Sequence, residues 1–105
     1  MEGLPLSVLN LEQMRTNAGE AAELLKTLAN RNRLLILCTL AEGESSVSDL
    51  NARVELSQSA LSQHLGVLRQ RGIVQTRREA QTIYYSLADS SALSVIGTLH
   101  EIYCA

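Results

Sequence analysis

The feature that most constrains the fold is the segment "QSALSQHLGVLRQRG" at residues 58–72. Leu61, Leu65 and Leu68 recur there at helical spacing and predict one apolar stripe that packs against a core. The opposite side of this predicted helix begins with serine and glutamine and ends in arginine, whereas a solvated helix face is usually built from lysine and glutamate. The composition therefore indicates a face whose short hydrogen-bonding groups contact a partner.

A second helix is expected immediately before this one. The sequence "SVSD" at residues 46–49 fits a capping box, in which Ser46 accepts a hydrogen bond from a backbone N–H three residues on and Asp49 bonds back. This helix is expected to reach about Val54, and "ELS" then leads into the next helix, with Ser57 as its N-cap. Two helices joined by so short a turn predict a helix-turn-helix.

Three further helices are expected from apolar periodicity and capping residues. Their expected ranges are 11–28, 31 to about 40, and from residue 90 or 91 to about 103. The middle one, "RNRLLILCTL", follows Asn30 as its cap and is apolar nearly all round, so we expect it to be buried. Ser90 or Ser91 is the expected cap of the last helix, and Gly43 and Gly72 are expected to end helices.

After residue 72 the periodicity changes from helical to alternating. In "IVQTRREAQTIYYSL" apolar side chains alternate with more polar neighbours, which is typical of half-buried strands. We expect a two-stranded hairpin with strands over 74–78 and 82–87. The expected fold class is therefore mainly α with a small β-hairpin: a single winged helix-turn-helix domain over residues 1–105, with five or six helices.

The distribution of charge favours one class of partner. The whole chain has a formal net charge of −2, but residues 53–85 hold five arginines and two glutamates, a net charge of +3. Such a local charge attracts phosphate even in an acidic chain. The chain contains no Phe, no Trp and three Tyr, which argues against proteins that stack single-stranded bases on aromatic side chains.

Several other functional classes have no support in the sequence. The apolar runs are too short to cross a bilayer, and the N-terminus lacks the pattern of a secretory signal, so we expect a cytoplasmic protein without a membrane partner. The sequence has no phosphate-binding loop, nucleophile elbow or HExxH motif, and neither His64 nor His100 has a partner at metal-site spacing. We therefore expect no enzymatic activity, no cofactor and no bound metal.

Together these features predict binding to double-stranded DNA, with the second helix of the pair in the major groove. The residues expected at base edges are Gln58, Ser59, Ser62 and Gln63, with His64 as a further candidate. The residues expected at phosphates are Arg69 and Arg71 near the end of the helix, and Arg77 and Arg78 near the hairpin tip. The alternatives are a polar face that is only solvated, and a winged helix that binds another protein.

Four segments between residues 29 and 87 show a family resemblance: "LANRNRLLILCTL", "SVSDL", "LSQSALSQHLGVLRQRGIV" and "RREAQTIYYSL". With the flanking helices, they resemble the ArsR/SmtB family of small dimeric winged-helix repressors. The resemblance implies a homodimer, and the apolar faces of the first and last helices are consistent with that interface. A symmetric dimer in turn predicts a palindromic operator with half-sites about one helical turn apart, or a multiple.

Many members of this family release DNA when a metal binds, and two family metal sites can be compared with this chain. One resembles "ELCVCDL", and its cysteines fall on Ser46 and Ser48, whose hydroxyls are poor ligands for soft ions. The other resembles D-x-H: Asp89 is present, but Ser91 and Ile102 stand where histidines belong. A metal-responsive repressor with a different site is the alternative reading of the regulation.

The two cysteines, Cys38 and Cys104, are 66 positions apart. Their placement, one in the second helix and one at the end of the last, resembles the thiol-switched branch of the family, the HlyU and BigR types. That resemblance implies that the two thiols meet and form a disulfide or polysulfide bridge in response to oxidants or reactive sulfur, which changes DNA affinity. From the residues alone, Cys38 is also explained as a small core residue.

Overall fold

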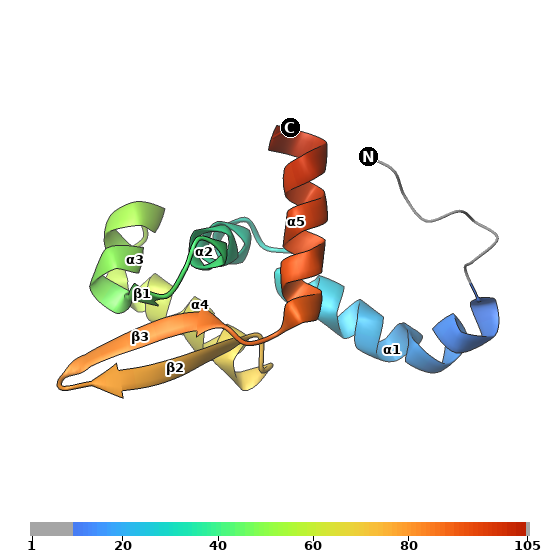
Figure 1. Cartoon of the computed structure of the whole chain (residues 1–105), viewed down its shortest axis with the longest axis horizontal. Helices are drawn as coiled ribbons and strands as arrows, with labels where there is room; N and C mark the ends of the chain where they lie inside the picture. The colour runs from blue at the N-terminus through green and yellow to red at the C-terminus, as the bar shows by residue number, and fades with distance from the viewer. Residues whose placement is uncertain (1–9, 105) are drawn as a thin grey trace.

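The structure is a computed structural model that describes residues 10–104 (Figure 1). Its elements are α1 (Leu11–Leu28), α2 (Arg31–Ala41), β1 (Ser45–Ser46), α3 (Val47–Val54), α4 (Gln58–Gln70), β2 (Val74–Glu79), β3 (Thr82–Leu87) and α5 (Ser90–Cys104). Five helices and a small antiparallel sheet within this range confirm the expected fold class, a winged helix-turn-helix. None of these helices is long and apolar enough to span a membrane. The N-terminus, where the sequence predicts no secretory signal, lies outside the described residues.

Three of the helices begin at the caps that the sequence predicts. The Asn30 side chain accepts hydrogen bonds from two backbone N–H groups in the first turn of α2, at 3.0 and 3.1 Å. Ser46 accepts from the Asp49 N–H at 3.2 Å, and Ser57 accepts from the Ala60 N–H at 3.1 Å. Each bond satisfies a donor that the helix itself leaves unpaired, so these short side chains fix where α2, α3 and α4 start.

Two capping predictions differ from the structure. The expected caps of α5, Ser90 and Ser91, are wrong: Asp89 precedes the helix, and its Oδ1 accepts a hydrogen bond from the Ser91 N–H at 2.8 Å. A carboxylate both accepts this bond and interacts favourably with the positive end of the helix. Of the two bonds in the predicted capping box, the structure shows only the one that Ser46 accepts, and Ser46 also lies opposite Tyr84 in the sheet.

The sheet has a third strand that the sequence did not predict. Ser45 and Ser46 of β1 pair with Tyr85 and Tyr84 of β3, which gives the strand order β1-β3-β2. The strands β2 and β3 pair along their whole length, and a two-residue turn at 80–81 joins them. The turn is therefore one residue shorter than expected, and its first residue has a positive φ of 56°. The two long strands form the wing.

The core forms where the predicted leucine stripe of α4 meets its neighbours. Leu61, Leu65 and Leu68 are all buried, in one cluster with Ile36 and Leu37 of α2 and with side chains from α3, β2 and α5. At roughly 1.5–3 kcal/mol for each large apolar side chain removed from water, this stripe is a main source of stability. It also fixes which side of α4 faces outward.

The expectation that α2 is buried all round is wrong for one of its sides. Ile36, Leu37 and Leu40 are buried, whereas Leu35 is 39% exposed and Cys38 is exposed. The helix packs against α3, β3 and α5, and these neighbours leave its remaining side open. Cys38 is therefore not a core residue.

The first half of α1 is exposed on every side. In Figure 1, α1 and the wing extend in opposite directions from α5. Residues 11–20 are all exposed, and Leu11, Met14 and Leu25, which lie on one stripe of the helix, are 54–65% exposed. Such a stripe is too apolar for a face that stays in water.

Candidate nucleic-acid interface and cysteine pair

The polar side of α4 faces outward, opposite the buried leucine stripe. The exposed side chains are Gln58, Ser59, Ser62 and Gln63. Within the described chain, the side chains of Gln58, Ser62 and Gln63 have no hydrogen-bond partner, and Ser59 Oγ lies 3.5 Å from the Ser57 Oγ. The first two turns of α4 therefore present hydroxyl and amide groups that can donate to and accept from base edges.

His64 is placed differently from these four residues. It is half-buried, and its Nδ1 lies 3.5 Å from a terminal nitrogen of Arg33 on α2. The Arg33 Nε in turn donates to the Thr27 carbonyl oxygen at 2.6 Å. His64 therefore lies at the contact between α4 and the junction of α1 and α2, a position that helical periodicity alone did not reveal.

The four candidate arginines fall into two pairs. Arg69 and Arg78 are exposed and form no ion pair with any residue of the range 10–104. Arg71 lies 3.1 Å from a carboxylate oxygen of Glu23 on α1. Arg77 is bound by carboxylates on two sides, which makes it the most constrained of the four.

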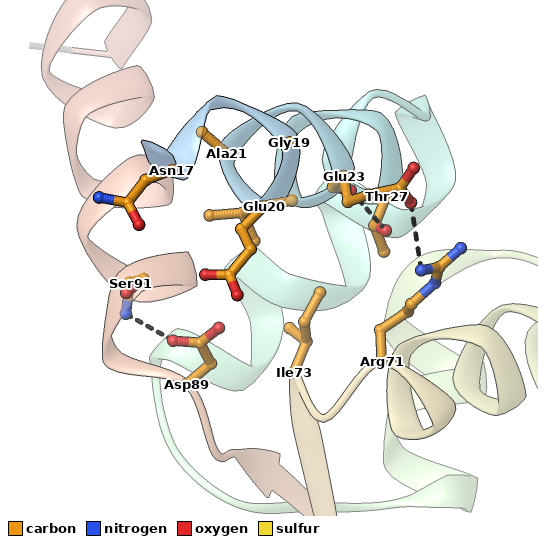
Figure 2. Close-up of a pocket in the computed structure, with 11 residues that line it drawn as sticks. Asn17, Gly19, Glu20, Ala21, Glu23, Thr27, Arg71, Ile73, Asp89 and Ser91 are labelled. Atoms are coloured by element: carbon orange, nitrogen blue, oxygen red, sulfur yellow. Dashed lines mark hydrogen bonds and ion pairs between the residues drawn. The ribbon is translucent and has the colours of Figure 1, made fainter. Parts of the chain in front are cut away.

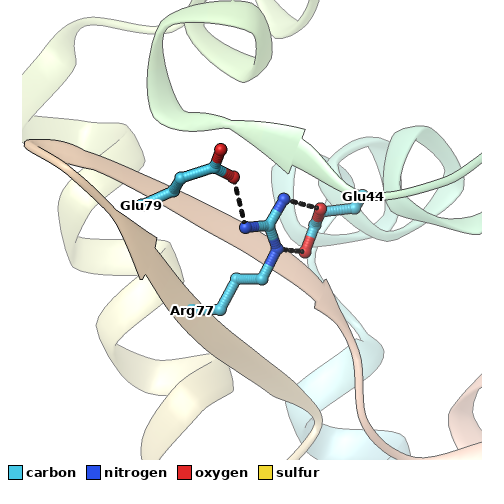
Figure 3. A network of polar contacts seen from close by, with 3 residues as sticks. All are labelled: Glu44, Arg77 and Glu79. Carbon is cyan, nitrogen blue, oxygen red and sulfur yellow. Dashed lines mark hydrogen bonds and ion pairs between the residues drawn. The ribbon is translucent and has the colours of Figure 1, made fainter.

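Arg77 forms a polar cluster with Glu44 and Glu79 (Figure 3). Its Nε and one terminal nitrogen donate to the two Glu44 oxygens at 2.7 and 2.8 Å, and the other terminal nitrogen donates to Glu79 at 2.7 Å. These hydrogen bonds hold the pKa of Glu44 below its ordinary value. The guanidinium also lies 4.5 Å from the centre of the Tyr84 ring. Sequence reasoning missed Glu44, because only the folded chain brings it to Arg77.

Cys38 and Cys104 lie on helices that pack together, α2 and α5, and both thiols are free and exposed. Burial of the sulfur raises the pKa of Cys38, and the charge of a Cys104 thiolate raises it further. The fold therefore places two cysteines that are far apart in the sequence on helices that contact each other.

Cys38 also lines a cavity of about 260 Å³ between α2 and the turn that joins α3 to α4. Leu35 and Leu56 form apolar parts of its wall, and Arg31 and Arg53 form polar parts. Small reagents can therefore reach the sulfur from solution, which a thiol in the core would not allow.

A larger hollow of about 570 Å³ lies where α1, the α4–β2 turn and the start of α5 meet (Figure 2). Glu23 pairs with Arg71 there and so joins α1 to the α4–β2 turn, whereas the bond from the Ser91 N–H to Asp89 lies within the start of α5. No three His, Cys, Asp or Glu side chains in the part of the chain that the structure describes are grouped to hold a metal ion.

A helix-turn-helix that packs its apolar side into the core, the outward polar face of α4 and the hairpin beside it together define a winged-helix DNA-binding protein. The family profile of bacterial regulatory proteins of the arsR family matches residues 30–76. The chain belongs to the arsR family of transcription regulators, in the branch that includes HlyU and BigR, and it is not an enzyme.

Two relatives and one solved structure illustrate this membership. The transcriptional activator HlyU of Vibrio cholerae is 49% identical over 104 residues, covering 99% of this chain and 94% of the relative. A biofilm growth-associated repressor of Agrobacterium fabrum is 50% identical over 102 residues, covering 97% and 87%. The crystal structure of the repressor BigR from Xylella fastidiosa matches with a TM-score of 0.88 at 45% identity, covering 92% of this chain and 99% of that one.

Proposed function

We propose that this regulator is a homodimer that binds a palindromic operator and that a bridge between Cys38 and Cys104 switches its DNA affinity. The observation that carries the DNA-reading part is the outward polar face of α4 on a helix whose other side is fully buried. The similarity of the whole chain to proteins named as activators and repressors supports a role at promoters. Because the proposed ligand is chromosomal DNA, we place the protein in the cytoplasm.

The proposed base contacts are made by the first two turns of α4. They come from the exposed residues Gln58, Ser59, Ser62 and Gln63. The half-buried His64 is a further candidate. The proposed phosphate contacts come first from Arg69 and Arg78, which have no carboxylate partner in the described chain. Arg71 and Arg77 are weaker candidates for phosphate contacts, because carboxylates within the chain already neutralise each of them.

The DNA-reading face is tested with Gln63→Ala, measured by fluorescence anisotropy on duplexes that the wild type selects from a random library. We expect about tenfold weaker binding and relaxed sequence preference at one position, because a side chain at a base edge contributes about 1–3 kcal/mol of discrimination. Gln13→Ala, which truncates an exposed glutamine on α1, is the matched control. A Gln63→Ala protein with unchanged affinity and preference would rule out this face as the DNA-reading surface.

Phosphate contacts have a separate signature in the same assay. Arg69→Gln is expected to weaken binding to every duplex. It should reduce the slope of log affinity against log salt by about 2, because the dimer loses one phosphate contact in each half-site. Gln63→Ala is expected to leave that slope unchanged, because it removes no charge. An Arg69→Gln variant with the wild-type slope would exclude Arg69 from the phosphate contacts.

The proposed dimer covers the apolar stripe of α1. Leu11, Met14 and Leu25 are exposed on a helix whose first half extends from the rest of the protomer (Figure 1). A second copy of the chain is the proposed cover for this exposed stripe, since most soluble oligomers are symmetric homodimers. A two-fold axis between protomers would present two copies of α4 to half-sites about one helical turn apart, or a multiple.

The proposed switch is a covalent link between α2 and α5. An oxidant that joins Cys38 to Cys104 removes two electrons and two protons as the sulfur–sulfur bond forms, and sulfane sulfur would extend the bridge by added sulfur atoms. Both thiols are exposed and lie on helices that contact each other, which supports a bridge that forms in the folded protein. A bridge at this point would favour one arrangement of the dimer and hence one spacing of the two α4 helices.

The raised pKa of Cys38 predicts a pH dependence of its reactivity. Less of this thiol is thiolate at neutral pH than in an ordinary cysteine, so its alkylation by iodoacetamide should keep accelerating at pH values above the usual thiol pKa. Cys104→Ser removes the charge contribution and should move the midpoint to lower pH, while the larger contribution from burial remains. Mass spectrometry of the alkylated peptide measures both rates. A midpoint that stays in place in Cys104→Ser would contradict the proximity of the two sulfurs.

A further inference from the structure

The guanidinium of Arg77 is occupied by the chain's own groups. All three of its nitrogens donate to carboxylate oxygens of Glu44 and Glu79 at 2.7–2.8 Å (Figure 3). The guanidinium also lies over the Tyr84 ring, 4.5 Å from its centre. Bidentate pairing of this kind fixes the orientation of both partners, which a single ion pair between flexible side chains does not.

The charge of this cluster is unfavourable for a phosphate. One guanidinium faces two carboxylates, so Arg77, Glu44 and Glu79 together have a net charge of −1. A phosphate approaching Arg77 would meet the two carboxylates as well, and like charges repel. The neighbouring Arg78 points to the opposite face of β2, because successive side chains of a strand alternate, and it has no ion pair within the described residues.

The position of Glu44 means that its pairing with Arg77 connects two separate parts of the fold. Glu44 belongs to the connection between α2 and β1, and the chain continues from there directly into α3, the first helix of the helix-turn-helix. Arg77 lies on β2, the outer strand of the wing, which does not pair with β1. The ion pair therefore joins the far strand of the wing to the entrance of the helix-turn-helix, across 33 positions of sequence.

We propose that Arg77 is a positioning residue: it fixes the wing against the α2–β1 connection, at a set angle to α4, and leaves the phosphate contact to Arg78. This proposal rests on the DNA surface proposed above and refines the role of one residue in it. The two roles of Arg77 predict opposite effects of removing the Glu44 carboxylate on DNA affinity. If Arg77 contacts phosphate, its release should tighten binding. If the ion pair holds the wing in place, its loss should weaken binding.

The test compares Glu44→Gln, Arg77→Gln and the double variant on the selected duplexes across a range of KCl concentrations. Glu42→Gln is the matched control, because it removes the same charge from the same connection and breaks a pair with Arg53 on α3 that does not involve the wing. Arg78→Gln serves as the reference for a lost phosphate contact.

We expect Glu44→Gln and Arg77→Gln each to weaken binding roughly three- to fivefold relative to Glu42→Gln, the upper part of the range for an exposed ion pair. The double variant should be no weaker than Arg77→Gln alone, since both changes break one interaction. The salt slope should stay at the wild-type value in these variants and fall by about 2 in Arg78→Gln, one contact in each half-site. Tighter or unchanged binding by Glu44→Gln, or a slope reduced by about 2 in Arg77→Gln, would overturn the proposal.

A measurement without DNA separates this proposal from the proposed function. Spin labels at Ser48 on α3 and Gln81 in the wing turn, in a Cys38→Ser and Cys104→Ser background, report the distance between the two elements. We expect Glu44→Gln to broaden that distance distribution and Glu42→Gln to leave it unchanged. A distribution that Glu44→Gln leaves unchanged would overturn the positioning role, whether or not Gln63→Ala affects DNA binding.

Discussion

Replacing Met14 and Leu25 with aspartate is expected to convert the regulator from a dimer to a monomer and to weaken operator binding by at least about 100-fold. Both side chains are more than half exposed, so the substitutions cost the protomer little stability, whereas two charges placed in a dimer interface would be buried without partners. The loss on DNA is large because two linked half-sites gain roughly 10²- to 10⁴-fold over one. Light scattering measures the mass, and anisotropy measures the affinity.

The control for this experiment is Thr16→Asp. Thr16 lies on the side of α1 opposite the apolar stripe and is exposed, so the same new charge should leave both mass and affinity unchanged. A double variant that stays dimeric at micromolar concentration would show that α1 is not at the interface.

Cys38→Ser and Cys104→Ser are each expected to abolish the response of DNA affinity to persulfide or oxidant while leaving the affinity of the reduced protein intact. Both thiols are exposed and lie on α2 and α5, outside the proposed DNA-reading helix α4, so serine removes the reactive group with little effect on folding or base contact. Mass spectrometry of the treated protein, paired with anisotropy on the same sample, relates the mass of the bridge to the change in affinity.

Two results would contradict the switch. One is a full response in both single variants. The other is release of DNA by a stoichiometric metal ion in the reduced wild type, which would favour the metal-responsive alternative instead.

Much of the fold was predictable because its determinants are local in the sequence. The leucine stripe of α4 and the caps Asn30 and Ser57 depend on residues within three or four positions of one another, and the structure confirms all of them. The outward face of α4 followed directly, since burying one side of a helix determines the other. The candidate base contacts could therefore be chosen before any coordinates were known.

What the sequence did not reveal depends on tertiary packing. Helical periodicity cannot distinguish the two sides of an apolar helix, so the exposure of Leu35 and Cys38 followed only from where α3, β3 and α5 pack. The strand β1 has two residues, too few to show alternation. The partner of Arg77 is 33 positions away, and no short-range pattern connects them.

In the proposed dimer, the exposed first half of α1 would make folding and self-association one process. Residues 11–20 are all exposed, and these ten residues are fewer than the roughly 12–15 that an isolated helix needs in water. In the proposed dimer, the partner subunit supplies the missing contacts, so newly synthesised subunits complete this element only after they meet. The cellular abundance of the regulator would then set how much of it is competent for transcription control, before any sulfur chemistry takes place.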